Sequence, residues 1–534
     1  MKKLLSIIGV GIALLGSGCG KGFLTNLQSN PNAPTTSTAT PPFVLPGCIT
    51  GLVNIVNDVT GTGTNPSYEV EAVWMGYWNY QPGYAFNTNV QDYIVTSSGP
   101  QLWDNYYGVL TNLNFIIQDT AGGAQYANYH DIAQILSAVC FQNLVDLYGN
   151  IPYSQALKVT SNFYPSYDSA SAIYDSLTAK LDNAMADITA NMSNAAVVVP
   201  AGDDVMYGGN MANWILFANT VKLRLLVRES NVASKAAYIQ NEIAKTAADG
   251  YLTTDAVVNP GYSSADPNLI WGGFGISPSG SLNYAASFVG GNGTAVNFYQ
   301  STNDPRLGYF YTRNGVTANQ DSFSIVTLPI DPTQYFAQPI GSQASNPNNG
   351  GSANIGSGLV KSPSQPAVMM TAAESYFNQA EATLYGWIPG GASGAQTDYQ
   401  KGITASFEYL NVGGSTALAD TYAAAYYGQN ISWVAFPAGV GMDSLVHTIL
   451  TQKWAALNGI NAAESFNDWR RTFNASLNSG YPIVPVSISS SNSAPHMPFR
   501  YLYPTEEQTS NKAAWTAAGG ANIDPFNTKI FWMP

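Results

Sequence analysis

The chain has 534 residues, only 10% of them charged, and a formal net charge of −13. This charge argues against nucleic acid or an anionic lipid surface as the main partner, because both select clusters of lysine and arginine. With 45% hydrophobic and 12% aromatic residues, the chain can build a folded core, which excludes a disordered protein.

The first residues resemble the signal of a bacterial lipoprotein. Two lysines precede an apolar run over residues 4–15, which is too short to span a bilayer, and small residues then lead to Cys19. We expect a signal peptide over residues 1–18 and lipidation of Cys19, although Gly16 stands where such signals usually carry leucine. An ordinary signal peptide with an incidental cysteine is the alternative.

Residues 19–40 are rich in Asn, Pro, Thr and Ser and predict a flexible tether. Residues 41–534 predict one helical domain. The spacing of apolar residues predicts helices over 42–59, 101–120, 131–148, 167–190, 211–230, 234–248, 367–386, 395–409, 443–457 and 461–471, and part of a helix over 67–84.

The stretch from Asp131 to Leu157 is expected to lie at the centre of the fold. Its apolar residues recur at the spacing of one helix face, and Gly149 followed by Asn150 should end the helix before a second short segment. This is half of a helical-hairpin repeat, and the later segment from Ala382 to Ala405 resembles a tetratricopeptide helix pair. Cys140 lies inside the helix and is interpreted as a packing residue.

Residues 259–364 change in character, since they are rich in Gly, Asn, Ser, Pro and aromatic residues and have little periodicity. A long irregular run inside a compact domain is often functional. The tail from Pro482 to Pro534 is predicted to be coil. The fold class is therefore mainly α, a scaffold of paired helices with long irregular loops that form the ligand face.

Aromatic residues near loops are the best candidates for a binding site. Aromatic rings can cover the C–H faces of sugars, while Asn and Gln exchange hydrogen bonds with sugar hydroxyls. The aromatic candidates are Trp74, Trp78, Tyr80, Tyr84, Trp271 and Trp433, and the polar candidates are Asn79, Gln81 and Asn87. Because Trp74 and Trp78 stand four residues apart on one predicted helix face, both could instead belong to the core.

Catalytic motifs are absent from the sequence. The three histidines are far apart in the sequence, and no nucleophile elbow or phosphate-binding loop occurs. A glycosidase needs two carboxylates across a sugar, and the candidate pairs are Glu69 with Glu71, Asp203 with Asp204, Glu374 with Glu381, and Glu506 with Glu507. We predict no enzyme activity, no metal and no cofactor, with a secreted glycoside hydrolase as the alternative.

Six segments stand out along the chain: DLYGNIPYSQAL (146–157), NWILFANTVKLRLLVR (213–228), NDPRL (303–307), AAESYFNQAEATLYGW (372–387), QKWAALNGINAAESFNDWRRT (452–472) and PFRYLYPTEEQTSN (498–511). Together they resemble the SusD/RagB family of outer-membrane lipoproteins, and the resemblance covers nearly the whole chain after Cys19.

This resemblance implies a surface lipoprotein of the outer membrane that is not an enzyme. It would capture oligosaccharides and deliver them to a SusC-like TonB-dependent transporter. Peptides are the alternative ligand within the same architecture. Many members carry an acidic export signal after the lipidated cysteine, which Lys21 and its glycine neighbours do not provide here.

Overall fold

The computed structural model describes residues 39–57, 69–81, 88–98, 102–119, 123–158, 161–314, 326, 328–342 and 352–534. Cys19, Tyr84 and Asn87 lie outside these residues. The described chain is mostly helical, as the sequence predicts. No helix in the described part of the chain has the length and apolar character of a membrane span.

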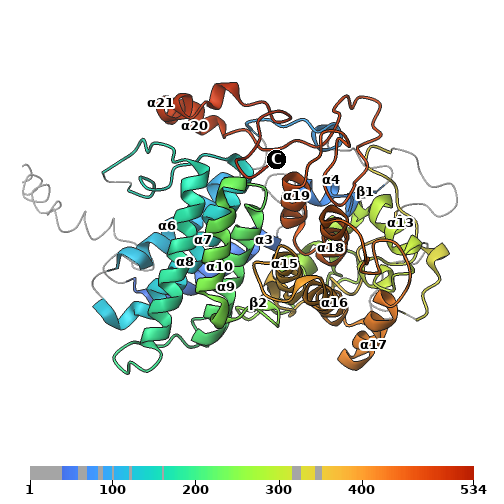
Figure 1. Cartoon of the computed structure of the whole chain (residues 1–534), viewed down its shortest axis with the longest axis horizontal. Coiled ribbons are helices and arrows are strands. Elements are labelled where there is room, and N and C mark those ends of the chain that lie inside the picture. The colour runs from blue at the N-terminus through green and yellow to red at the C-terminus, as the bar shows by residue number, and fades with distance from the viewer. Residues whose placement is uncertain are drawn as a thin grey trace, which may run out of the picture.

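The N-terminal half is a row of long helices in which successive helices pack against one another (Figure 1). These helices are α3 (Pro41–Asn57), α6 (Leu102–Gln118), α7 (Ala127–Tyr148), α8 (Ala170–Asn191), α9 (Met211–Arg228) and α10 (Ala236–Lys245). Helix α7 contacts α3, α6, α8 and α9, so the predicted central stretch is central in space as well.

Helix α7 is buried on almost every side, and Cys140 within it is fully buried. The helix ends at Gly149, which has φ +78 and donates its N–H to the carbonyl of Val145. Glycine adopts this left-handed conformation without a steric penalty. The sequence signal for the end of the helix is thus confirmed.

The C-terminal half repeats the helix-pair arrangement. Its helices are α15 (Ala372–Leu384), α16 (Gly391–Tyr409), α17 (Thr416–Tyr427), α18 (Met442–Leu457) and α19 (Ala462–Arg471). Helices α15 and α16 form an extensive antiparallel pair, and α15 also packs on α9, which joins the two halves. The pair predicted from residues 367–409 is present, but its first four residues form a strand.

Two short antiparallel ribbons connect segments that are far apart in the sequence. Strand β1 (Trp78–Tyr80) pairs with β3 (Val289–Gly291), and β2 (Ala256–Val258) pairs with β4 (Ala367–Met370). Each ribbon brings part of the region after residue 250 onto the helical scaffold.

The region 259–364 is less irregular than predicted, because its described part contains several short helices. The short α-helices of the described residues are α4 (Glu69–Trp74), α5 (Thr88–Gln91), α11 (Leu269–Phe274), α12 (Tyr284–Phe288), α13 (Gly293–Ser301), α14 (Leu307–Phe310), α20 (Thr505–Ser510) and α21 (Lys512–Ala517). The 3-10 turns are η1 (Gly123–Tyr126), η2 (Ala233–Lys235), η3 (Ala247–Asp249), η4 (Pro332–Gln334), η5 (Val412–Gly414) and η6 (Gly520–Asn522). The tail is not simple coil either, because it contains the short helices α20 and α21. Both lie at the upper edge of Figure 1.

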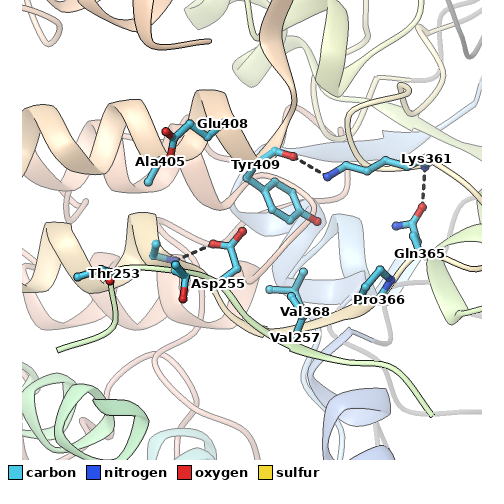
Figure 2. A pocket seen from close by; sticks show the side chains of 12 residues that line it. Thr253, Asp255, Val257, Lys361, Gln365, Pro366, Val368, Ala405, Glu408 and Tyr409 are labelled. Atoms are coloured by element: carbon cyan, nitrogen blue, oxygen red, sulfur yellow. Dashed lines mark hydrogen bonds between the residues drawn. The ribbon is translucent and has the colours of Figure 1, made fainter. Parts of the chain in front are cut away.

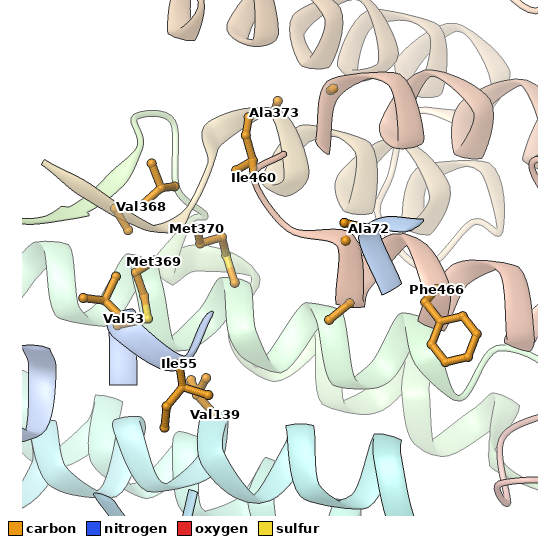
Figure 3. Close-up of a cluster of buried hydrophobic side chains, with 14 of the residues drawn as sticks. Val53, Ile55, Ala72, Val139, Val368, Met369, Met370, Ala373, Ile460 and Phe466 are labelled. Carbon is orange, nitrogen blue, oxygen red and sulfur yellow. The ribbon is translucent and has the colours of Figure 1, made fainter. Parts of the chain in front are cut away.

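The apolar core runs continuously between the two halves (Figure 3). Val53 from α3 and Val139 from α7 meet Met369 and Met370 from β4, while Phe466 from α19 extends the cluster. Burial of such side chains stabilises each by roughly 1.5–3 kcal/mol. The short helices and loops after residue 259 therefore pack on one contiguous core.

Ion pairs are also buried at the junction of the halves. The buried cations are Arg224, Arg228, Lys453, Arg470 and Arg471, and the buried carboxylates are Asp146, Glu374, Glu381, Glu464 and Asp468. Lys453 Nζ lies 2.8 Å from Asp468 Oδ2, and Arg471 Nε lies 2.8 Å from Asp468 Oδ1. Burial would raise the pKa of Asp468, but these cations outweigh burial and hold the pKa below its ordinary value. The charges of these helices are thus structural.

Candidate functional site

The β1–β3 ribbon places two of the predicted aromatic segments side by side. Trp78 pairs with Gly291 and Tyr80 with Val289, and the N–H of Gln81 donates to the carbonyl of Phe288 at 2.7 Å. The segment 74–81 therefore lies against the segment 284–291. Because these two segments lie far apart in the sequence, their pairing was not predicted.

Four of the predicted ligand contacts are in the core, so these predictions are corrected. Trp74 is 2% exposed and donates its indole N–H to the carbonyl of Val90, and Trp78 is 0% exposed. Asn79 is buried and donates from Nδ2 to the carbonyl of Pro339 at 2.9 Å. Tyr80 is buried as well, and burial raises the pKa of its phenol. Since protein atoms cover both faces of the ribbon, these side chains present nothing to a ligand.

Gln81 has a structural role. Its Nε2 donates to the carbonyl of Ser352 at 3.0 Å and to Oδ1 of Asn354 at 2.9 Å, while its Oε1 accepts from the N–H of Ser352 at 2.9 Å. The amide thus holds the segment 352–354 against the ribbon. Both of its ends are occupied, so Gln81 is not a free ligand contact.

Trp271 is half-buried at the first turn of α11. The side chain of Asn268 accepts the N–H of Trp271 at 2.9 Å and caps the helix. Phe274, three residues later, faces inward, with its ring centroid 5.0 Å from that of Trp78. The ring of Trp271 lies over Gly275, where a Cβ atom would come within 2.6 Å of Trp271 Cδ2. The position of the Trp271 ring therefore requires a residue without a side chain at position 275.

Tyr284 was not predicted, yet it is 70% exposed at the start of α12. Its ring centroid lies 4.7 Å from that of Phe288. Asn283 connects α12 to α11, because its Nδ2 donates to the carbonyl of Trp271 at 2.8 Å and its N–H to the carbonyl of Gly275 at 2.9 Å. A sequence signal could have indicated Tyr284. This aromatic residue directly follows an Asn, and the Asn precedes a short helix.

We call Trp271, Asn283, Tyr284 and Phe288 the Trp271–Tyr284 surface. A turn with hydroxyls joins its two helices, since the N–H of Ser277 donates to the carbonyl of Ser281 at 2.8 Å. The surface combines exposed ring area with serine hydroxyls and backbone groups. Such a combination suits a polar ligand that has flat C–H faces.

Trp433 is exposed at a different place, on the connection between α17 and α18. It is 40% exposed, and its φ of +68 is unusual for a bulky residue. Its ring centroid lies 3.9 Å from that of His447, which is in turn 3.9 Å from that of Tyr481. Burial lowers the pKa of His447 to about 4.

Each carboxylate pair considered for hydrolysis includes a group with a structural partner. Glu374 lies 3.2 Å from Arg224, and Glu381 is bonded to Arg471. Asp204 accepts three backbone N–H groups and the indole N–H of Trp214. Within the described ranges, no group of three His, Cys, Asp or Glu side chains is arranged to hold a metal ion.

Fold and surface together define a scaffold of paired helices whose exposed aromatic residues stand on loops and short helices. The chain belongs to the SusD-like family, because the family model described as "Starch-binding associating with outer membrane" matches residues 40–504. No sequence among the curated proteins matches the chain.

Solved structures share this fold across almost their whole length. A chitin-binding SusD homolog from Flavobacterium johnsoniae is 22% identical, with a TM-score of 0.70 over 91% of this chain and 98% of that chain. A SusD homolog from Bacteroides fragilis is 21% identical, with a TM-score of 0.70 over 92% and 99% of the two chains. A SusD/RagB family protein from Bacteroides thetaiotaomicron is 19% identical, with a TM-score of 0.69 over 92% and 99%.

Proposed function

We propose that this protein is a lipid-anchored glycan-binding protein of the outer membrane that captures oligosaccharides and passes them to a TonB-dependent transporter. The observation that carries the proposal is the exposed Tyr284 on a short helix that Asn283 ties to the helix of Trp271. Membership in a family described as starch-binding supports a glycan ligand. The chitin-binding homolog of the same fold supports a glycan ligand whose sugar rings offer flat faces for stacking.

Capture is by stacking. A pyranose ring that lies on Tyr284 buries C–H groups against the phenol, while its hydroxyls remain at the edge and bond to serine and backbone groups. No covalent step is involved, so the protein binds without turnover. Trp433, with its ring held against His447, is a second proposed aromatic contact for a longer chain.

Calorimetry with starch and chitin oligosaccharides tests the glycan ligand. Tyr284→Ala should weaken binding by about five- to thirtyfold, since stacking of this kind contributes on the order of 1–2 kcal/mol. Tyr164→Ala is the matched control, because Tyr164 is also 70% exposed but lies elsewhere on the chain. Equal loss in both variants, or none in either, would contradict the site.

Product analysis of each bound glycan separates this proposal from a hydrolase, which would release shorter sugars. Peptides are screened in the same series, and binding of peptides alone would replace the glycan by a peptide ligand.

Anchoring and delivery are tested in cells. Cys19→Ala should release the protein from the outer membrane, and the wild-type protein should co-purify with a large barrel protein.

A further inference from the structure

A cavity of about 370 Å³ lies between the β2–β4 ribbon and the C-terminal end of α16 (Figure 2). Its lining comes from the segments 253–257, 361–368 and 405–409 and from Ala372. None of these residues belongs to the Trp271–Tyr284 surface or lies near Trp433 in the sequence. The volume is in the range of small-ligand sites, roughly 300–1,000 Å³.

The cavity has an apolar floor and an aromatic wall. Val257 and Val368 are paired across the ribbon and form the floor. Figure 2 shows the ring of Tyr409 above these two valines. A flat molecule could therefore lie between the ribbon and the phenol.

The cation of the cavity is already engaged. Lys361 Nζ donates to the carbonyl of Tyr409 at 2.5 Å and lies 4.0 Å from the centroid of the Tyr409 ring. That carbonyl is at the end of α16, where a positive charge is favoured by the helix dipole. Gln365 is engaged too, because its Oε1 accepts from the N–H groups of Lys361 and Ser362.

Two carboxyl groups lie at the rim, on Asp255 and Glu408, and the Glu408 carboxyl is hydrogen-bonded to that of Asp420. Asp255 Oδ1 accepts the N–H of Ala372 at 2.8 Å, and Figure 2 shows its other oxygen turned toward the side of Tyr409. Burial raises the pKa of Asp255 despite this bond and the nearby Lys361. Partial burial, the adjacent Asp420 carboxyl and Asp255 raise the pKa of Glu408. A positively charged group at this rim would relieve the repulsion between the carboxylates.

We propose that this cavity binds an amino sugar, with its ring against Tyr409 and its primary ammonium group between Asp255 and Glu408. The apolar floor, the aromatic wall and the two threonines at positions 253 and 254 suit a pyranose, whereas the carboxylates select an ammonium over a hydroxyl or an amide. This site is additional to the proposed glycan surface and does not depend on it.

Three sugars that differ only at C2 test the proposal on the intact protein. Ligand-detected NMR and calorimetry are run with glucosamine, glucose and N-acetylglucosamine. Glucosamine should bind at least about tenfold more tightly than the other two. Equal binding of glucose and glucosamine, or no binding of glucosamine at tens of millimolar, would overturn the proposal. Glycinamide binding as tightly as glucosamine would overturn the sugar part of the assignment.

Two variants locate the bound ammonium. Glu408→Gln and Asp255→Asn keep the shape of each side chain, and the Asn oxygen can still accept the N–H of Ala372. Each should weaken glucosamine binding by about tenfold. Asp398→Asn, on α16 but outside the cavity, and Tyr284→Ala should leave it unchanged, so a failure here is distinct from a failure of the glycan surface. Unchanged affinity in both cavity variants would refute the proposal.

Discussion

Arg471 and Glu381 are joined by two parallel hydrogen bonds, 2.6 Å from Nη1 to Oε1 and 2.5 Å from Nη2 to Oε2, inside the packed helices. Both side chains are fully buried. Glu381→Gln should lower the free energy of unfolding by about 3–5 kcal/mol, because it leaves a buried guanidinium without its main countercharge. Denaturant unfolding measures the loss.

The control for this prediction is an exposed pair of the same helical region. Lys401 Nζ lies 3.1 Å from Asp398 on α16, and the Lys401 side chain is 51% exposed. Lys401→Gln should change the stability by less than about 1 kcal/mol, since solvent screens exposed pairs. Similar losses in Glu381→Gln and Lys401→Gln would show that burial does not set the strength of these pairs.

The position of the Trp271 ring should depend on Gly275. Gly275→Ala places a methyl group within 2.6 Å of Trp271 Cδ2 and of the Trp271 carbonyl oxygen, so the indole must move. We expect glycan binding to weaken by several-fold, measured by calorimetry. Gly272→Ala, on the same helix, adds a methyl that meets only Pro267 at 4.0 Å and should leave binding intact. Unaltered binding by Gly275→Ala would remove Trp271 from the site.

Trp78 should matter for stability and not for ligand contact. Trp78→Ala should cost about 3–5 kcal/mol, as expected for truncation of a buried indole. Among the described residues the indole N–H has no hydrogen-bond acceptor, so Trp78→Phe loses no hydrogen bond and should cost much less. Thermal unfolding distinguishes the two variants. A Trp78→Ala protein that keeps its melting temperature but loses glycan would restore Trp78 to the binding site.

Glu71 should make stability depend on pH. It is fully buried, its Oε1 accepts the Tyr501 hydroxyl at 2.7 Å, and burial raises its pKa from 4.5 to about 7. Between these two values the folded state keeps a proton that the unfolded state has released, so this group's contribution to stability falls as the pH rises.

Glu71→Gln carries no titrating proton and should lose this dependence. The decrease in unfolding free energy from pH 5 to pH 8 should be smaller than in the wild type by roughly 2–3 kcal/mol. Glu506→Gln, an exposed change on α20, serves as the comparison. Identical pH slopes for wild type and Glu71→Gln would show that Glu71 does not hold the proton.

The long helices could be predicted because their signal is local. Helices α7, α8 and α9 carry apolar residues at helical spacing over five or more turns, and their cores are buried as expected. Helix α17 was missed because its sequence, TALADTYAAAYY, is rich in alanine and has no strong apolar face. Asp168, just before α8, holds the preceding loop, since its carboxylate accepts the N–H groups of Tyr153 and Ser154.

The candidate site was predicted less well because exposure depends on distant pairing. Trp74 and Trp78, four residues apart, suggested one helix face, whereas α4 ends at Trp74 and Trp78 begins a strand. That strand is covered because β3 and the segment 352–354 pack on it. Nothing within residues 74–81 encodes this covering. Tyr284 is the opposite case, a residue that the fold leaves exposed. It was missed because only its position at the start of α12 leaves its side chain uncovered.

The β1–β3 ribbon has a consequence for the order of folding. Asn292 Nδ2 donates to the carbonyl of Trp78 across 214 residues of chain, so this contact closes a very large loop. The helix pairs between these two residues rely on near neighbours and can form first. The aromatic surface is then a late product of folding, because it stands on a ribbon that closes only after these pairs.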